Sequence, residues 1–146
     1  MKRFLVLMLG VVLAVNAAAE EWAVRVKAAG SFEDARDAVV AAIENRGLVI
    51  NYTSHIADML TRTGADLGAT RKIFERAEIV EFCSARLSRQ MMEDDPHNII
   101  LCPFAVSIYT LPGEAGTVWL AYRKPPARAG AAVEGLLQAI VAEAGR

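Results

Sequence analysis

The feature that most constrains the fold is a long run of alternating apolar residues, followed after a turn by a second, shorter run. Alternation with a period of two places every second side chain on one face of a β-strand. Residues 111–116 between the runs contain a Pro-Gly pair typical of a turn, so the two runs predict an antiparallel hairpin. Pro103 within the first run predicts an edge position or a bulge. The apolar residues of the two runs are Ile100, Cys102, Phe104, Val106 and Ile108, then Val118, Leu120 and Tyr122.

Shorter patterns predict three more strands and a first helix. Alternating apolar and polar residues indicate strands over residues 22–27, 48–53 and 77–83. Ser31, with Asp34 three positions later, is close to a capping box and predicts the start of a helix. The helix should end before the Gly that precedes the second of these strands, because Gly readily adopts the conformation that ends a helix.

Two further helices are predicted later in the chain. Ser84 can cap a helix that runs to about Asp95 and is stopped by Pro96. Residues 133–141 carry apolar side chains at helical spacing and predict an amphipathic C-terminal helix. Residues 56–74 show only one or two turns of helical pattern, weakened by glycines. These elements predict an α+β domain, with a mostly antiparallel sheet and helices packed on one face.

The N-terminal residues have the pattern of an export signal. Two basic residues precede an apolar stretch over residues 4–15, and small residues stand before Glu20. Such a stretch is too short for a membrane-spanning helix, which needs about 20 residues. We therefore expect residues 1–19 to be a cleaved signal peptide and residues 20–146 to form a single α+β domain, periplasmic or secreted and without stable membrane insertion. The alternative is an uncleaved N-terminal anchor.

The composition excludes two classes of protein. The 16 Lys and Arg residues are balanced by 17 Asp and Glu residues, for a net charge of −1. This balance argues against a nucleic-acid-binding protein with a broad basic face. A hydrophobic fraction of 54% also excludes a disordered chain.

The chain has two cysteines, Cys83 and Cys102, whose role the sequence leaves open. In an oxidising compartment they would form a disulfide, and a loop of this length would contribute about 3 kcal/mol in the chain-entropy model. They could equally be two buried free thiols, or a redox-active pair in which Cys83 lies near a helix N-terminus.

A metal site is a further interpretation of this region. Met91, Met92 and His97 stand near the cysteines, and such soft ligands suit copper(I). However, the spacing matches no zinc pattern, and the two adjacent methionines point to different faces of the predicted helix. We therefore assign no metal and no cofactor.

The segments around the cysteines resemble a family known as domain of unknown function 302. This family typically has an acidic residue and Cys-Asn-Pro at the end of a strand, then a helix, an acidic residue with Pro, and a strand that opens with Leu-Pro-Cys. The corresponding stretches here are Glu81-Phe82-Cys83-Ser84-Ala85, Asp95-Pro96 and Leu101-Cys102-Pro103-Phe104. Two departures are clear: Ser84 and Ala85 replace the Asn and Pro, and Cys102 stands two residues before the family position.

The resemblance implies a curved sheet with helices on one side, similar to the arrangement of the TATA-binding protein, and it is compatible with a homodimer. The family has no established activity. The matching positions Glu81, Cys83 and Ser84 are nevertheless candidate binding residues, as is Trp119, whose place in the alternation predicts that it faces away from the core.

No catalytic residues can be assigned, since the chain has only two His and neither a Ser-His-acid pattern nor a Gly-rich phosphate loop. The sequence therefore favours a non-catalytic binding or interaction module, whose partner is a small ligand or a protein. The alternative is a thiol- or metal-dependent redox protein centred on Cys83 and Cys102. An unrecognised hydrolytic enzyme is a third interpretation.

Overall fold

A computed structural model describes residues 22–146, so the predicted signal peptide lies outside the described residues. The described chain forms one sheet with the spatial order β1-β5-β4-β3-β2, in which every pair of neighbouring strands is antiparallel. The strands are β1 (Ala23–Ala28), β2 (Val49–His55), β3 (Arg76–Cys83), β4 (Phe104–Thr110) and β5 (Val118–Arg123). The predicted hairpin is confirmed as β4 and β5.

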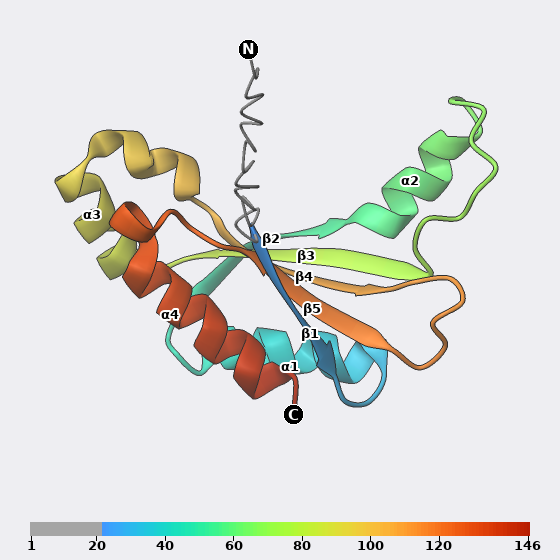
Figure 1. Cartoon of the computed structure of the whole chain (residues 1–146), viewed down its shortest axis with the longest axis horizontal. Coiled ribbons are helices and arrows are strands. Elements are labelled where there is room, and N and C mark those ends of the chain that lie inside the picture. Colours follow the sequence, from blue (N-terminus) through green and yellow to red (C-terminus); the bar gives the residue numbers. More distant parts are fainter. Residues whose placement is uncertain (1–21) are drawn as a thin grey trace, which may run out of the picture.

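Two helices, α1 (Phe32–Glu44) and α4 (Ala127–Ala144), cover one face of the sheet and contact each other (Figure 1). The capping box predicted for α1 is present: the Asp34 N–H donates to Ser31 Oγ at 3.1 Å, and the Ser31 N–H donates to Asp34 Oδ2 at 2.9 Å. The α+β fold with helices packed on one face of an antiparallel sheet is therefore confirmed.

The other helices lie at the ends of the sheet. Figure 1 shows α2 (Ile56–Gly64) projecting away from the side that α1 and α4 cover. All residues of α2 are described, and none of them is buried. At the opposite end, α3 (Ala85–Asp94) begins at the predicted cap, Ser84, and is followed by the short 3₁₀ helix η1 (Pro96–Leu101). Within residues 22–146, no helix has the length and apolar character that a membrane span requires.

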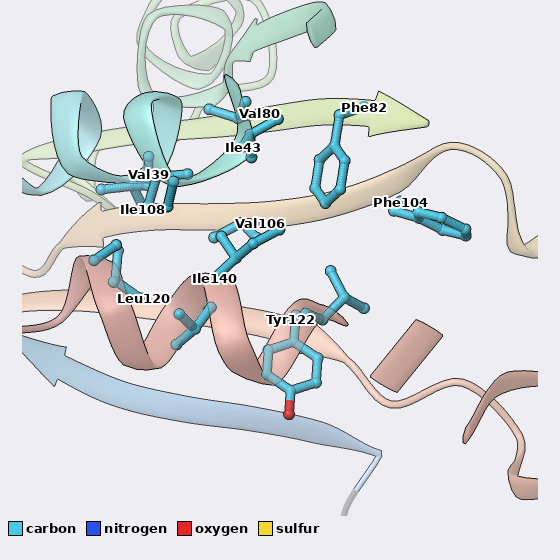
Figure 2. Packing of buried hydrophobic residues seen from close by; sticks show 14 of the residues in the cluster. Val39, Ile43, Val80, Phe82, Phe104, Val106, Ile108, Leu120, Tyr122 and Ile140 are labelled. Atoms are coloured by element: carbon cyan, nitrogen blue, oxygen red, sulfur yellow. The ribbon is translucent and has the colours of Figure 1, made fainter. Parts of the chain in front are cut away.

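The hydrophobic core lies between the sheet and the two covering helices (Figure 2). Alternate residues of the central strands point into it and are fully buried, so the alternation in the sequence correctly identified the core face of the hairpin formed by β4 and β5. Burial of each such side chain contributes about 1.5–3 kcal/mol relative to exposure. The central core residues are Val39 and Ile43 of α1, Val80 and Phe82 of β3, Val106 and Ile108 of β4, Leu120 of β5 and Ile140 of α4.

The first half of the long apolar run differs from its prediction. Ile100 belongs to η1 and is 84% exposed, and Pro103 precedes β4 rather than lying within it. The reason is local, because Pro96 starts η1 and the Asp95 side chain caps it by accepting the His97 N–H at 2.9 Å. β4 is also a central strand, so the predicted edge position is wrong.

Candidate functional site

The sheet face opposite α1 and α4, here called the uncovered face, carries small residues at its centre. β3, β4 and β5 turn large aliphatic residues toward the core, and the intervening positions face the other way. Because small side chains on three adjacent strands leave room above the sheet, they form the floor of a depression, here called the hollow. The floor residues are Ala77, Ala105, Ser107 and Ala121.

Larger side chains surround this floor. Phe74 and Tyr109 form one wall, with their rings 5.8 Å apart in an edge-to-face arrangement. Ile56, the first residue of α2, and Ile79 of β3 also line the hollow, and Trp22 stands at its other side. The hollow has a volume of about 490 Å³ and an apolar lining on a rigid sheet, which is the size and character of a small-molecule site.

Two arginines stand at one rim of the hollow. Arg25 of β1 pairs with Ala121 of β5, which makes Arg123 its diagonal neighbour, at a Cα distance of about 7–8 Å in such a ladder. The Arg25 guanidinium lies 5.5 Å from the centre of the Trp22 ring. A cation–π contact of this kind holds a positive charge beside an apolar wall. This rim therefore adds positive charge to the lining of the hollow.

One acidic residue, Glu78, also borders the hollow. Its Oε1 atom lies 3.5 Å from Nδ1 of His55, and its charge also acts on Arg36 of α1. The carboxylate therefore already interacts with His55 and with the charge of Arg36. The arginine rim remains the cationic part of the lining.

Trp119 lies on the uncovered face, as its place in the alternation predicts. Its Nε1–H donates to Glu114 Oε2 at 2.9 Å, and Lys27 Nζ lies 5.3 Å from its ring centre. The side chain is half-buried and does not line the hollow. The indole N–H of Trp119 is thus already hydrogen-bonded within the domain, and Lys27 partly covers the ring.

Trp22 differs from its predicted place. The alternation predicted a strand over residues 22–27, but Trp22 precedes β1 and is 67% exposed. Trp22 instead borders the hollow.

The two cysteines lie at one end of β3 and β4, far along the strands from the aromatic wall of the hollow. The register that pairs Phe82 with Phe104 places residues 83 and 102 at the same end of neighbouring strands. Both are half-buried free thiols, so the structure does not contain the disulfide that was one of the alternatives left open by the sequence. Burial raises the pKa of Cys83, and the charge of Cys102 and a hydrogen bond with it raise this pKa further.

The other family-derived candidates surround this thiol pair. Glu81 is half-buried on the same strand as Cys83, and its charge also raises the pKa of that thiol. Ser84 is buried, and its Oγ accepts the Leu87 N–H at 3.4 Å. Its hydroxyl therefore caps α3, which is the role that the sequence predicts for it.

The described part of the chain contains no group of side chains that is typical of a metal site. Among the residues that the structure describes, no three His, Cys, Asp or Glu side chains are placed to hold one ion. Met91 is buried in the core, as a gap-filling methionine would be, whereas His97 is exposed. The soft ligands considered from the sequence are thus divided between the core and the surface.

Sequence reasoning missed the hollow, because it followed the large apolar side chains to the core and gave no role to the small ones. A signal was present. Ala105, Ser107 and Ala121 alternate with large core residues in the same strands, so three small side chains fall on one face of a predicted hairpin. What the sequence could not provide was the position of Phe74 and Ile56, which come from a segment without a clear pattern.

The comparisons with known proteins concern the fold and the family. The crystal structure of an uncharacterized conserved DUF302 protein from Bacillus stearothermophilus superposes with a TM-score of 0.69 at 15% sequence identity, covering 86% of this chain and 98% of the other. At this identity the likeness shows the fold alone. No protein of curated function shows significant sequence similarity to the chain. The family model described as "Domain of unknown function DUF302" matches residues 22–146, so the resemblance seen around the cysteines is confirmed and the chain belongs to the DUF302 family.

Proposed function

We propose that the protein is a non-catalytic binding protein whose ligand is an amphipathic carboxylic acid, held in the hollow on the uncovered face. The apolar body of the ligand would lie on the alanine and serine floor between the aromatic walls. Its carboxylate would lie at the rim formed by Arg25 and Arg123. The observation that carries this proposal is the combination of an apolar hollow with a cationic rim on one side.

The shape and lining support an apolar ligand body. Rigid strands form the floor, so the hollow does not depend on closure of a loop. The aromatic rings of Trp22, Phe74 and Tyr109 offer large contact areas at little cost in side-chain entropy. Apolar contact of this kind supplies affinity, whereas the few polar groups set orientation.

The charge distribution supports a carboxylate rather than an amine. A guanidinium presents a planar set of donors that matches the two oxygens of a carboxylate. An ammonium ligand would instead be repelled by both rim arginines. A neutral ligand of the same shape should bind more weakly than the acid, because it would gain the apolar contact alone.

Tryptophan fluorescence can test the proposal, because Trp22 borders the hollow. The Trp119→Phe variant would leave Trp22 as the tryptophan that reports on the site. Decanoate, decanol and decylammonium would be titrated separately. We expect saturable quenching or a blue shift with decanoate, a weaker response with decanol and the weakest with decylammonium. Equal affinity for all three would contradict the carboxylate proposal, and no saturable response to any of them would contradict a small-molecule site.

Neutral rim variants sharpen this test. Arg25→Gln and Arg123→Gln should each weaken decanoate binding about threefold, as expected for an exposed charge pair worth a few tenths to one kcal/mol. Decanol binding should hardly change. The matched control is Arg128→Gln, which removes an arginine that does not line the hollow.

Two properties expected from the sequence belong to the same proposal. Export would place the domain in the periplasm or outside the cell, and N-terminal sequencing of protein recovered from those fractions would test cleavage before Glu20. A homodimer would give twice the chain mass in light scattering. A dimer that dissociates when decanoate is added would indicate that a second copy and the carboxylic acid compete for the uncovered face.

The alternative function, a thiol- or metal-dependent redox protein, concerns another part of the molecule. Its candidate residues, Cys83 and Cys102, do not line the hollow. Loss of either cysteine should therefore leave decanoate binding unchanged. Binding in the hollow and thiol chemistry can be tested separately.

A further inference from the structure

A second depression lies beside the hollow, between α2 and the segment that connects α2 to β3, and is here called the α2 groove. It has a volume of about 700 Å³ and a mostly apolar lining. Its large aliphatic side chains are Leu60 of α2 and Leu67 and Ile73 of the connecting segment. None of the residues of α2 is buried, so this helix contributes no side chain to the core. Its apolar residues line an open groove instead.

The α2 groove and the hollow meet at Phe74, which lines both depressions. The start of α2 shows the same boundary, because Ile56 lines the hollow and the next residue, Ala57, lines the groove. The backbone beside Phe74 is fixed to the sheet, since the Glu75 N–H donates to the carbonyl oxygen of Thr110 at 3.0 Å. An apolar chain on the floor of the hollow can therefore continue past Phe74 into the groove.

The arginine rim and the α2 groove lie at opposite sides of the hollow. Arg25 and Arg123 belong to β1 and β5, whereas Phe74 shortly precedes β3 and Ile56 directly follows β2. In the sheet order β1-β5-β4-β3-β2, β1 and β3 are three strand spacings apart, which is about 14 Å. An extended decanoate is comparable in length to this distance. Decanoate with its carboxylate at the rim would therefore end near Phe74.

We infer that the ligand of the hollow is a long-chain carboxylic acid, whose tail extends beyond Phe74 and lies in the α2 groove. This inference rests on the proposed function, because it requires a carboxylate at the arginine rim, and it narrows the ligand class to acids longer than decanoate. The hollow alone provides contact for a medium-length chain, whereas the groove adds apolar contact for a longer one.

The opposite orientation of the ligand is the alternative, because Arg71 and Lys72 also line the α2 groove. Lys72 forms an ion pair with Glu75, so its charge is already balanced, and Arg71 is exposed. We assign the carboxylate to the arginine rim, because two arginines stand there and one of them is held against the Trp22 ring.

A chain-length series tests the inference by isothermal titration calorimetry of the full chain. Octanoate, decanoate, dodecanoate and tetradecanoate would be titrated, each below its critical micelle concentration. Affinity should continue to rise beyond decanoate, by about two- to fourfold for each added methylene group, as expected for partial or complete burial of that group. Tetradecanoate should therefore bind at least about tenfold more tightly than decanoate.

The series separates failure of this inference from failure of the proposed function. Equal affinities for decanoate and tetradecanoate would show that the chain ends in the hollow. That result would overturn the inference and leave the proposed function intact. If no acid of the series bound saturably, the proposed function itself would be contradicted.

Variants of the groove show whether the longer chain lies beside α2. Leu60→Gln replaces a half-buried apolar residue and should weaken tetradecanoate binding about fivefold, because the tail loses apolar contact. Decanoate binding should hardly change. The matched control is Met59→Gln on the same helix, since Met59 lines neither depression. Equal weakening of both acids by Leu60→Gln, or an unchanged affinity for tetradecanoate, would overturn the inference.

A second groove variant avoids any cost to folding. Leu67 lines the groove and is 80% exposed, so Leu67→Gln should leave the fold intact. It should weaken tetradecanoate binding selectively, by less than Leu60→Gln does, because the exposed leucine makes less contact with the tail. Wild-type affinity for tetradecanoate in this variant would show that the tail does not lie along the groove.

Arginine variants establish the direction of the ligand. Arg25→Gln should weaken tetradecanoate binding about threefold, as expected for an exposed charge pair. Arg71→Gln should leave it unchanged. The reverse pattern would place the carboxylate in the α2 groove and overturn the inference, even if decanoate binding still depended on Arg25.

Discussion

On the covered face of the sheet, β3, β4 and β5 present large side chains that are buried under α1 and α4, whereas on the uncovered face the same strands present alanine and serine at the floor of the hollow. Ile108 and Ser107 show the difference within two adjacent residues of β4. The first has no exposed surface, and the second forms part of the floor of the hollow.

This difference indicates that the two faces of the sheet have different roles. The covered face supplies the folding free energy, because buried apolar area is the main favourable term in folding. A sheet face open to water usually carries polar residues, yet here small apolar residues are ringed by Trp22, Phe74 and Tyr109. The uncovered face is therefore available for a ligand at little cost to stability.

The largest contrast should appear in stability. Ile108→Ala removes a buried side chain from the covered face and should lower the free energy of unfolding by about 2–5 kcal/mol. Ser107→Ala, one position away on the uncovered face, should change it by less than about 0.5 kcal/mol. Urea denaturation of both variants measures the difference. Similar losses in the free energy of unfolding would show that side chains on the two faces contribute equally to stability.

The next effect concerns binding. Ser107→Leu should fill the floor of the hollow and weaken decanoate binding at least about tenfold, with little loss of stability, because the new side chain extends toward solvent. The matched variant Ser107→Ala should bind as wild type. If the leucine variant kept its affinity, the ligand would have to bind elsewhere.

A smaller effect separates a capping residue from a binding residue. Ser84→Ala should cost about 1 kcal/mol of stability, since it removes the side-chain acceptor at the start of α3. Decanoate binding should remain at the wild-type level. Loss of binding without loss of stability would instead indicate that Ser84 is a binding residue.

The smallest effect is a pH dependence at the helix that covers the core. The Ser31 hydroxyl, helped by the Ser31 backbone N–H, holds the pKa of Asp34 below its ordinary value. A carboxylate with a lowered pKa stabilises the folded state at higher pH, and this contribution is lost as the pH falls through the folded value, below about pH 4. In acid titrations followed by circular dichroism, Asp34→Asn should reduce the loss of stability in this range. An unchanged acid profile would show that the capping box contributes nothing to it.

The covered face could be predicted from the sequence, and the uncovered face could be predicted only in part. Alternation identified the core residues of β4 and β5 and the existence of β3, and the capping residues Ser31 and Ser84 marked the starts of two helices correctly. Both signals are local, because they depend on neighbours within a few positions.

The hollow depends instead on distant parts of the chain. Phe74 follows a segment without clear periodicity, and Trp22 stands just outside the strand pattern, yet both border the same floor. The apolar run was also misleading at Ile100, where a proline-started 3₁₀ helix replaces the expected strand. Likewise, the contact between Ser88 and Cys102 joins residues 14 positions apart and follows from tertiary packing.

Nuclear magnetic resonance titration of the full chain with decanoate tests the central claim most directly. The proposal predicts saturable changes in the chemical shifts of the backbone amides of Ala105, Ser107 and Ala121. The indole N–H signal of Trp22 should shift as well. The amide signals of core helix residues such as Val39 and Ile140 should keep their chemical shifts. Absence of saturable shifts, or shifts centred on residues away from the hollow, would contradict it.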